Sequence, residues 1–93
     1  MKSKVATLRF TQNIQRHVAC PTREVEGGTL ADVLEGYFRV YEQARRYVLD
    51  DQGKLRQHMT AFINGSQMRD RDQLSDPVPP DAVIDLVQAL SGG

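Results

Sequence analysis

Cysteine and surplus charge are both scarce in this chain, and each scarcity limits its function. The one cysteine, Cys20, cannot form a disulfide within the chain, which favours a reducing, cytoplasmic location. The 12 Lys and Arg residues balance the 12 Asp and Glu residues, so the formal net charge is zero. A general nucleic-acid binder needs a basic excess to displace counterions, and the composition argues against that class.

Long apolar runs are also absent. No stretch approaches the roughly 18 apolar residues that a membrane-spanning helix needs. The opening "MKSKVATLRF" is basic but has no apolar core of the kind found in secretory signal peptides. We therefore expect no membrane partner.

The sequence lacks the motifs of common catalytic sites. It has no glycine-rich phosphate loop, no Cys-x-x-Cys pair and no obvious nucleophile beside a base. His17 and His58 come without a cysteine or carboxylate cluster, so we predict no metal site. Cys20 could be a reactive thiol, but a small packing residue is the favoured interpretation.

What remains is the composition of one small α+β domain spanning residues 1–93. Hydrophobic residues make up 40% of the chain, which is enough for one modest core. Turn signals divide it into short segments. These signals are "CPT" at 20–22, "EGG" at 26–28, "DDQG" at 50–53, "NGS" at 64–66 and "DPVPPD" at 76–81.

The first half predicts a hairpin followed by a helix. "KVATLRF" alternates, with Ala6, Leu8 and Phe10 on one side, and "IQRHVAC" at 14–20 predicts a second strand after a turn at 11–13. One helix is then predicted from about Thr29, its N-cap, to Arg46. Its apolar stripe is Leu30, Val33, Leu34, Tyr37, Phe38, Tyr41 and Ala44.

The second half predicts short strands and turns. In order, these are a short strand at 47–49, a turn at 51–53, a strand at about 55–63, a tight Asn64-Gly65 turn, a short return at 67–68 and a last strand in "AVIDLVQAL". Leu74 and Val78 are expected to anchor the loop before that strand. The helix should lie across one face of a single sheet; a ferredoxin-like arrangement is the alternative, but it usually needs a second full helix.

Two glycines, Gly92 and Gly93, follow the last strand in "VQALSGG". Glycine has no Cβ and adopts nearly all backbone angles, so such an end can enter a channel too narrow for side chains. The alternative is an ordinary frayed terminus.

The strand-strand-helix-strand order, the "FINGSQM" turn and the ending "DAVIDLVQALSGG" resemble the ThiS/MoaD family of ubiquitin-like sulfur carriers over nearly the whole chain. The insert "YVLDDQGKLRQHM" is more similar to the longer, MoaD-like members. The resemblance implies the β-grasp fold, a mixed sheet wrapped on one main helix. The sequence departs from the family pattern in two segments, which are Pro79-Pro80-Asp81-Ala82 before the last strand and "QALSGG" at the end. The resemblance therefore does not select one biosynthetic pathway.

The resemblance also implies a chemistry for Gly93. A ubiquitin-activating-like adenylyltransferase would use ATP and Mg to join the Gly93 carboxylate to AMP, and a sulfur donor would then convert it to a thiocarboxylate. A sulfur-accepting enzyme would use this sulfur for molybdopterin, thiamin, cysteine or a thiolated metabolite. The carrier would bind no cofactor and have no catalytic residue, while Ser91 and Gly92 would thread the tail (90–93) into its partner.

Two other functions use the same features. The chain could be a ubiquitin-like interaction module with an inert tail, or a modifier conjugated to protein lysines through Gly93. A partner should hold an exposed apolar patch on the sheet face away from the helix. The strand alternation selects Phe62 and Val87 for this patch, with Leu90 near the tail.

Overall fold

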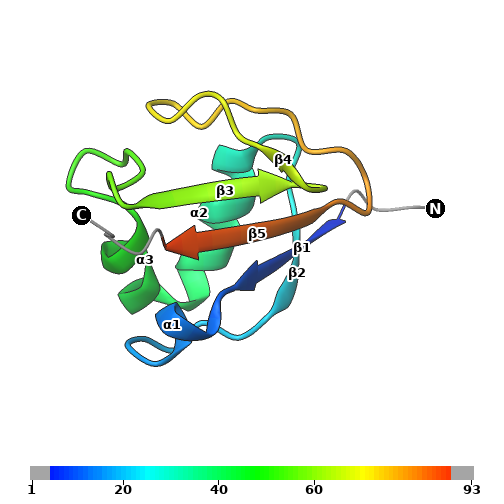
Figure 1. Ribbon diagram of the computed structural model, residues 1–93. Helices are drawn as coiled ribbons and strands as arrows, with labels where there is room; N and C mark the ends of the chain where they lie inside the picture. Colours follow the sequence, from blue (N-terminus) through cyan, green and yellow to red (C-terminus); the bar gives the residue numbers. More distant parts are fainter. Residues whose placement is uncertain (1–4, 89–93) are drawn as a thin grey trace.

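Five strands form one mixed sheet in the order β2-β1-β5-β3-β4 (Figure 1). The computed structural model describes residues 5–88. The strands are β1 Val5–Phe10, β2 Arg23–Glu26, β3 Met59–Ile63, β4 Ser66–Gln67 and β5 Val83–Gln88. β5 pairs in parallel with β1 and antiparallel with β3, so the last strand of the sequence lies at the centre of the sheet.

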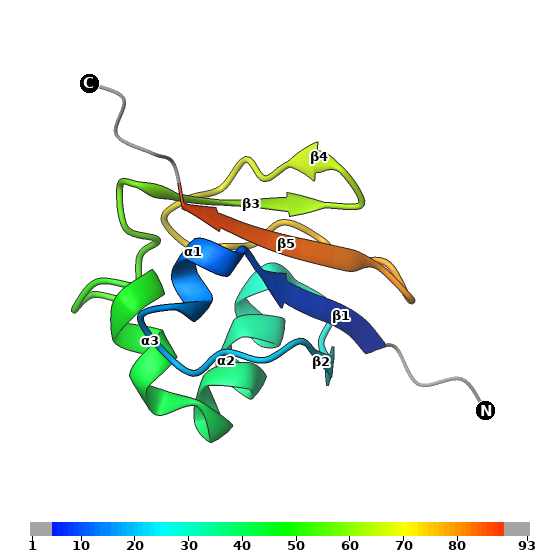
Figure 2. The same cartoon turned by 60° about the horizontal axis from the view of Figure 1, so that its bottom comes forward.

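The helices cover one face of this sheet, as Figure 2 shows. They are α1 Gln12–Gln15, α2 Leu30–Val40 and α3 Glu42–Val48. Alternate strand residues point toward them, and Ala6, Leu8, Ala61, Ile84 and Leu86 are each at most 1% exposed. The predicted α+β class, with a mixed sheet on one main helix, is confirmed.

The predicted hairpin is correct in topology but wrong in the position of its second strand. β1 pairs antiparallel with β2 at 23–26, whereas residues 12–15 form α1. Ile14 is fully buried and Val18 packs against the core. Their spacing of four residues suits a helical turn, which puts both on one face. β2 itself is a polar edge strand in which only Val25 is partly buried.

The predicted single helix is divided in two at Tyr41. Tyr41 has φ −114° and ψ 72°, outside the helical region, although its N–H still donates to the Tyr37 carbonyl at 3.1 Å. The chain turns there, and α3 buries Ala44 and Val48 completely. Of the predicted stripe, only Tyr41 is half-buried; the other members are buried.

The region after α2 also differs from the prediction. Residues 47 and 48 complete α3, and only Leu49 forms an isolated bridge, with Leu55, in place of a strand. The next strand begins at Met59 instead of about residue 55. The predicted turns are present: Asn64 and Gly65 have φ of 52° and 86°, and Gly53 has φ of 81°.

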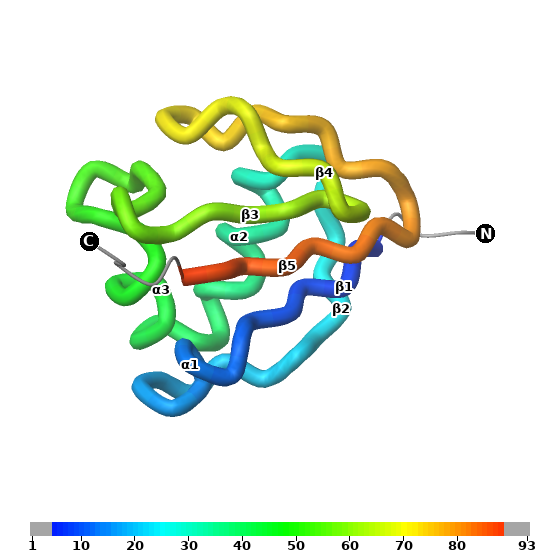
Figure 3. Tube along the Cα trace, in the orientation of Figure 1, coloured from blue at the N-terminus to red at the C-terminus, as the bar shows by residue number. Residues whose placement is uncertain are grey.

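The loop from 68 to 82 connects the sheet edge to its centre. Figure 3 follows it from β4 past the start of α2 to β5. As predicted, Leu74 and Val78 anchor it, at 4% and 5% exposed. The carbonyls of Leu74 and Asp76 accept hydrogen bonds from Ala31 and Leu30, donors that the first turn of α2 leaves free. The loop therefore acts as a cap for α2 together with Thr29, whose Oγ1 accepts a hydrogen bond from the Asp32 N–H.

Candidate functional site

The predicted reactive end lies beyond the residues that the structure describes. Leu90, Ser91, Gly92 and Gly93 all belong to the undescribed segment 89–93. The structure instead describes the strand that leads to them and the sheet face beside it. The roles of these four residues stay predictions.

The two other predicted surface residues, Phe62 and Val87, share the sheet face away from the helices. Phe62 pairs with Asp85, and Val87 pairs with Thr60, so both alternate with the core residues of their strands. Each is half-buried. They line a shallow hollow of about 510 Å³. Its other lining residues are Arg9, Phe10, Thr11, Thr22, Gly65 and Asp85.

An ion pair between Arg9 and Asp85 lines this hollow on the outer face of the sheet, called the outer hollow below. Arg9 Nε donates to Asp85 Oδ1 at 2.7 Å, and a second guanidinium nitrogen of Arg9 donates to Oδ2 at 3.0 Å. The hydrogen bond and charge of Asp85 raise the pKa of Arg9. Such an exposed pair contributes little to stability. The pair does neutralise the charges of Arg9 and Asp85, so these two residues add no net charge to the hollow that Phe62 and Val87 also line.

Three polar side chains meet at the end of β5, where sequence reasoning singled out none of them. Gln88 Oε1 accepts hydrogen bonds from Asn13 Nδ2 and from the Tyr47 hydroxyl, each at 3.2 Å. The signal in the sequence was the break in alternation, because Gln88 continues the inward series of Ile84 and Leu86 with a polar group. Asn13 and Tyr47 carry no comparable signal.

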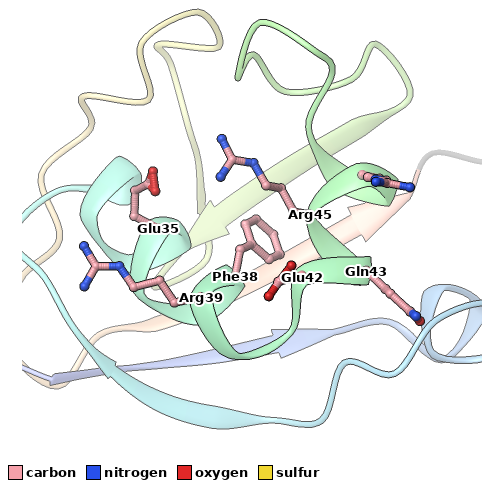
Figure 4. A pocket seen from close by; sticks show the side chains of 7 residues that line it. Glu35, Phe38, Arg39, Glu42, Gln43 and Arg45 are labelled. Carbon is pink, nitrogen blue, oxygen red and sulfur yellow. The ribbon is translucent and has the colours of Figure 1, made fainter.

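A second hollow, of about 630 Å³, lies between α2 and α3 on the helical side (Figure 4). Its lining residues are Glu35, Phe38, Arg39, Glu42, Gln43, Arg45 and Arg46. In Figure 4 the guanidinium groups of Arg39 and Arg45 lie on different sides of Phe38. Side chains of both charge signs line this second hollow and do not converge on one point. Its geometry therefore indicates no particular ligand.

The remaining candidate groups have structural contacts. Cys20 is 2% exposed, and burial raises the pKa of its thiol, which disfavours the reactive thiolate. The neighbouring Pro21 carbonyl accepts a hydrogen bond of 2.6 Å from the Tyr37 hydroxyl. His17 stacks on Tyr47 with ring centroids 5.7 Å apart. Between residues 5 and 88, no three His, Cys, Asp or Glu side chains gather in a way that could hold a metal ion.

The described part of the chain contains no helix with the length and apolar character needed to cross a membrane.

Comparison with known proteins identifies the fold through structure. No protein-family model matches the sequence, and no curated protein has significant sequence similarity to it. Among solved structures, SAMP1 from Haloferax volcanii matches with a TM-score of 0.79 at 18% identity, covering 96% of this chain and 99% of that one. The small archaeal modifier protein 1 of Methanosarcina acetivorans matches with a TM-score of 0.79 at 17% identity, covering 100% of both chains.

A third match is a chain of the Amycolatopsis orientalis BexX/CysO complex. Its TM-score is 0.78 at 16% identity, covering 95% of this chain and 99% of that one. Coverage of at least 95% on both sides with TM-scores of 0.78 or 0.79 means that these structures share the fold of this chain. The chain therefore has the ubiquitin-like β-grasp fold that its resemblance to the ThiS/MoaD family implied.

Proposed function

We propose that this protein is a sulfur carrier and not an enzyme. Its Gly93 carboxylate is adenylated by a ubiquitin-activating-like enzyme and converted to a thiocarboxylate that donates sulfur in a biosynthetic reaction. The observation that carries the proposal is the path of β5. This strand runs through the centre of the sheet toward Ser91-Gly92-Gly93, on a fold shared with small modifier proteins.

The position of β5 suits a carrier because the residues that build the core differ from the residue that would react. β5 is hydrogen-bonded to β1 on one side and β3 on the other, and its inward residues Ile84 and Leu86 are fully buried. The sequence beyond it is Ala89-Leu90-Ser91-Gly92-Gly93, and its last three residues present little side chain to a partner. A partner enzyme can then act on Gly93 without disturbing the core.

The proposed reaction has two steps. In the first, a Gly93 carboxylate oxygen attacks the α-phosphorus of ATP, pyrophosphate leaves, and an acyl adenylate forms. In the second, sulfide attacks the carbonyl carbon, and the bond to AMP breaks with AMP taking the electron pair. Both ATP and its Mg ion belong to the activating enzyme. The carrier contributes the carboxylate and a surface that the enzyme holds.

The outer hollow is the surface we assign to this contact. Phe62 and Val87 offer apolar area there, and the Arg9–Asp85 pair needs no counter-charge from a partner. The BexX/CysO complex, in which a chain of this fold is crystallised with a second protein, supports the expectation of a protein partner.

Removal of Gly93 tests the proposal. We expect deletion of Gly93, and Gly92→Val, to abolish ATP–pyrophosphate exchange with the cognate activating enzyme while leaving the thermal midpoint nearly unchanged. Gly28→Val is the matched control, because a Cβ at Gly28 would meet no atom within 4 Å and the position is far from the tail in sequence. Exchange by the truncated protein at the full-length rate would overturn the carrier function.

Intact mass of the protein purified from its own host reports the product. A sulfur carrier shows a species in which one oxygen is replaced by sulfur, and this species disappears in the Gly93 deletion. The proposal requires a free Gly93 carboxylate, and the same spectrum checks that requirement. If the chain continues beyond Gly93 in the host protein, the carboxylate mechanism is wrong.

A protein modifier is the second candidate, favoured by the small archaeal modifier proteins among the structural matches. The same adenylate would then be attacked by a lysine amine to give an isopeptide bond. Western blots of host lysate separate the two. Conjugates that survive denaturation and reduction, and that vanish on deletion of Gly93, would identify a modifier.

A further inference from the structure

Gln88 is the last described residue of β5 and breaks the pattern of its strand. It pairs with Met59, whose side chain is in the core, just as Leu86 pairs with Ala61 and Ile84 with Ile63. Directly opposed residues point to the same face of a sheet. Gln88 therefore points toward the helices, where the previous two inward residues of β5 are apolar.

Both helices at this end of the sheet supply a partner for the Gln88 amide. Asn13 lies in α1 and Tyr47 in α3, and each donates to Gln88 Oε1 at 3.2 Å. Figures 1 and 2 both place α1 and α3 beside the end of β5. A carbonyl oxygen has two lone pairs, so these two donors satisfy its accepting capacity.

A third contact holds the Tyr47 ring. The His17 imidazole stacks on it with an interplanar angle of 20° and a centroid separation of 5.7 Å. Tyr47 is partly buried against the core. The hydroxyl is thus presented to Gln88 by a ring that is packed on one side and stacked on another. We call Asn13, Tyr47 and Gln88 the exit clamp.

The exit clamp acts where β5 loses one of its neighbours. β1 pairs with β5 only as far as Phe10 and Leu86, whereas β3 continues to Gln88. The end of β5 is therefore paired on one side only, and the clamp replaces the missing restraint with side-chain hydrogen bonds. The five residues after Gln88 can span at most about 18 Å, so the direction of the chain at Gln88 limits the region that Gly93 can reach.

We propose that Asn13 and Tyr47 are positioning residues that fix, through Gln88, the direction in which the chain leaves the sheet and so present Gly93 to the activating enzyme. The inference rests on the proposed function. Because the clamp lies on the inner side of the sheet, it should affect the turnover of the bound carrier and not its capture by the outer hollow.

The test substitutes Tyr47→Phe, which removes the hydroxyl but keeps the stacked ring. Tyr41→Phe is the matched control, because the Tyr41 hydroxyl accepts a hydrogen bond from Arg23 in β2 and makes no hydrogen bond to a described residue of β5. We expect Tyr47→Phe to lower kcat for pyrophosphate exchange about threefold to tenfold, the size of one lost neutral hydrogen bond, with KM unchanged. Tyr41→Phe should leave both constants unchanged.

A second variant checks that the effect passes through Gln88. Gln88→Met keeps the side-chain length but removes the acceptor, and it should reproduce the loss in kcat. Tyr47→Phe should then have no further effect in the Gln88→Met protein. Additive losses in the double variant would overturn the clamp, as would a rise in KM with kcat unchanged.

Amide order parameters from NMR relaxation supply a readout that needs no partner enzyme. Tyr47→Phe should lower them from Gln88 onward relative to Tyr41→Phe, while the thermal midpoints of the two variants stay close. Equal order parameters in both variants would overturn the clamp. If the wild-type protein is never adenylated, the proposed function fails, and this measurement still decides whether the clamp restrains the chain.

Discussion

Gly36 shows how one missing side chain sets the distance between a helix and a strand. A Cβ placed there would lie 2.9 Å from Cγ1 of Val25, which is shorter than real contacts of this kind. Gly36 costs α2 about 1 kcal/mol of helix propensity relative to alanine. By sequence alone, a glycine within a helix is consistent either with a close approach to a neighbouring element or with a tolerated surface position. The structure shows a close approach of α2 to β2.

We therefore predict that Gly36→Ala destabilises the protein by about 1 kcal/mol. The propensity gain of about 1 kcal/mol is outweighed by overpacking, which typically costs about 1–3 kcal/mol. In a Val25→Ala background the obstructing methyl group is gone, and the same substitution should become stabilising. Urea denaturation of the four proteins measures both effects. Stabilisation by Gly36→Ala alone would contradict the close approach.

Asp70 organises its loop through its carboxylate. The Ser75 hydroxyl and the N–H groups of Gln73, Ser75 and Asp72 donate to it, and these hydrogen bonds hold its pKa below the ordinary value. A carboxyl with a lowered folded-state pKa stabilises the protein when ionised. This contribution is complete above the unfolded pKa of about 3.9 and is lost as the pH falls toward the folded pKa.

Acid should therefore destabilise wild type more than Asp70→Asn. We expect the thermal midpoint of wild type to fall more steeply between about pH 5 and pH 3 than that of the variant, which has no carboxyl to protonate there. Asp72→Asn, which removes the same charge from the same loop, is the control. Parallel curves for wild type and Asp70→Asn would show that the carboxylate contacts are energetically unimportant.

At the scale of elements, the sequence predicts the helices and strands that are marked by a pattern of neighbouring residues. β1 alternates because one of its faces is buried, and α2 begins directly after Thr29 because the Thr29 hydroxyl caps a free N–H group. Both features can be read from a few adjacent residues. The anchors Leu74 and Val78 were predictable for a related reason, since isolated apolar residues in a polar loop have few other places to go.

The elements that were missed depend on distant contacts. β2 is almost wholly polar and exists because β1 supplies its hydrogen-bond partners, so no apolar pattern marks it. The break at Tyr41 has no signal in the sequence, because the apolar stripe of α2 continues past Tyr41 to Ala44 in α3. The same limit applies to the site. Phe62 and Val87 follow from alternation, whereas the exit clamp joins residues from three elements.

The Asn64-Gly65 turn between β3 and β4 depends on an unusual backbone conformation. Gly65 has φ of 86°, a region that costs an L-residue about 1–2 kcal/mol. We predict that Gly65→Ala lowers the free energy of unfolding by about this amount in urea denaturation. Gly28→Ala, at a position with open space and no positive φ, should have a much smaller effect. Equal effects at both positions would mean that the turn is not restrictive.

At the scale of the whole molecule, the two faces of the sheet have different surroundings. The inner face carries the core and the outer face carries the hollow around Phe62 and Val87. Figure 2 shows all three helices on the inner side, which leaves the outer side open along the strands. Between residues 5 and 88, the most exposed large hydrophobic residue is Val40, which lies at the end of α2 instead.

A charge in the outer hollow should therefore weaken partner binding where a charge at Val40 does not. We predict that Val87→Asp raises the Kd for the cognate activating enzyme about tenfold or more, measured by calorimetry, because burial strands the new carboxylate without a partner. Phe62→Asp should behave alike, and Val40→Asp is the control. Thermal midpoints confirm that each variant is folded. Unchanged affinity in both outer variants would place the contact elsewhere.

The central place of β5 has a consequence for how the protein is made. β1 and β3 have no direct pairing in the described sheet, and β5 bridges them through contacts nearly 80 residues apart in sequence, such as Arg9 with Asp85. Such non-local pairing slows folding, because loop-closure entropy must be overcome before the contacts form. A nascent chain that lacks β5 can assemble neither half into a finished sheet. The sheet can therefore be completed only once β5 has been synthesised, so its assembly waits for nearly all of the described residues.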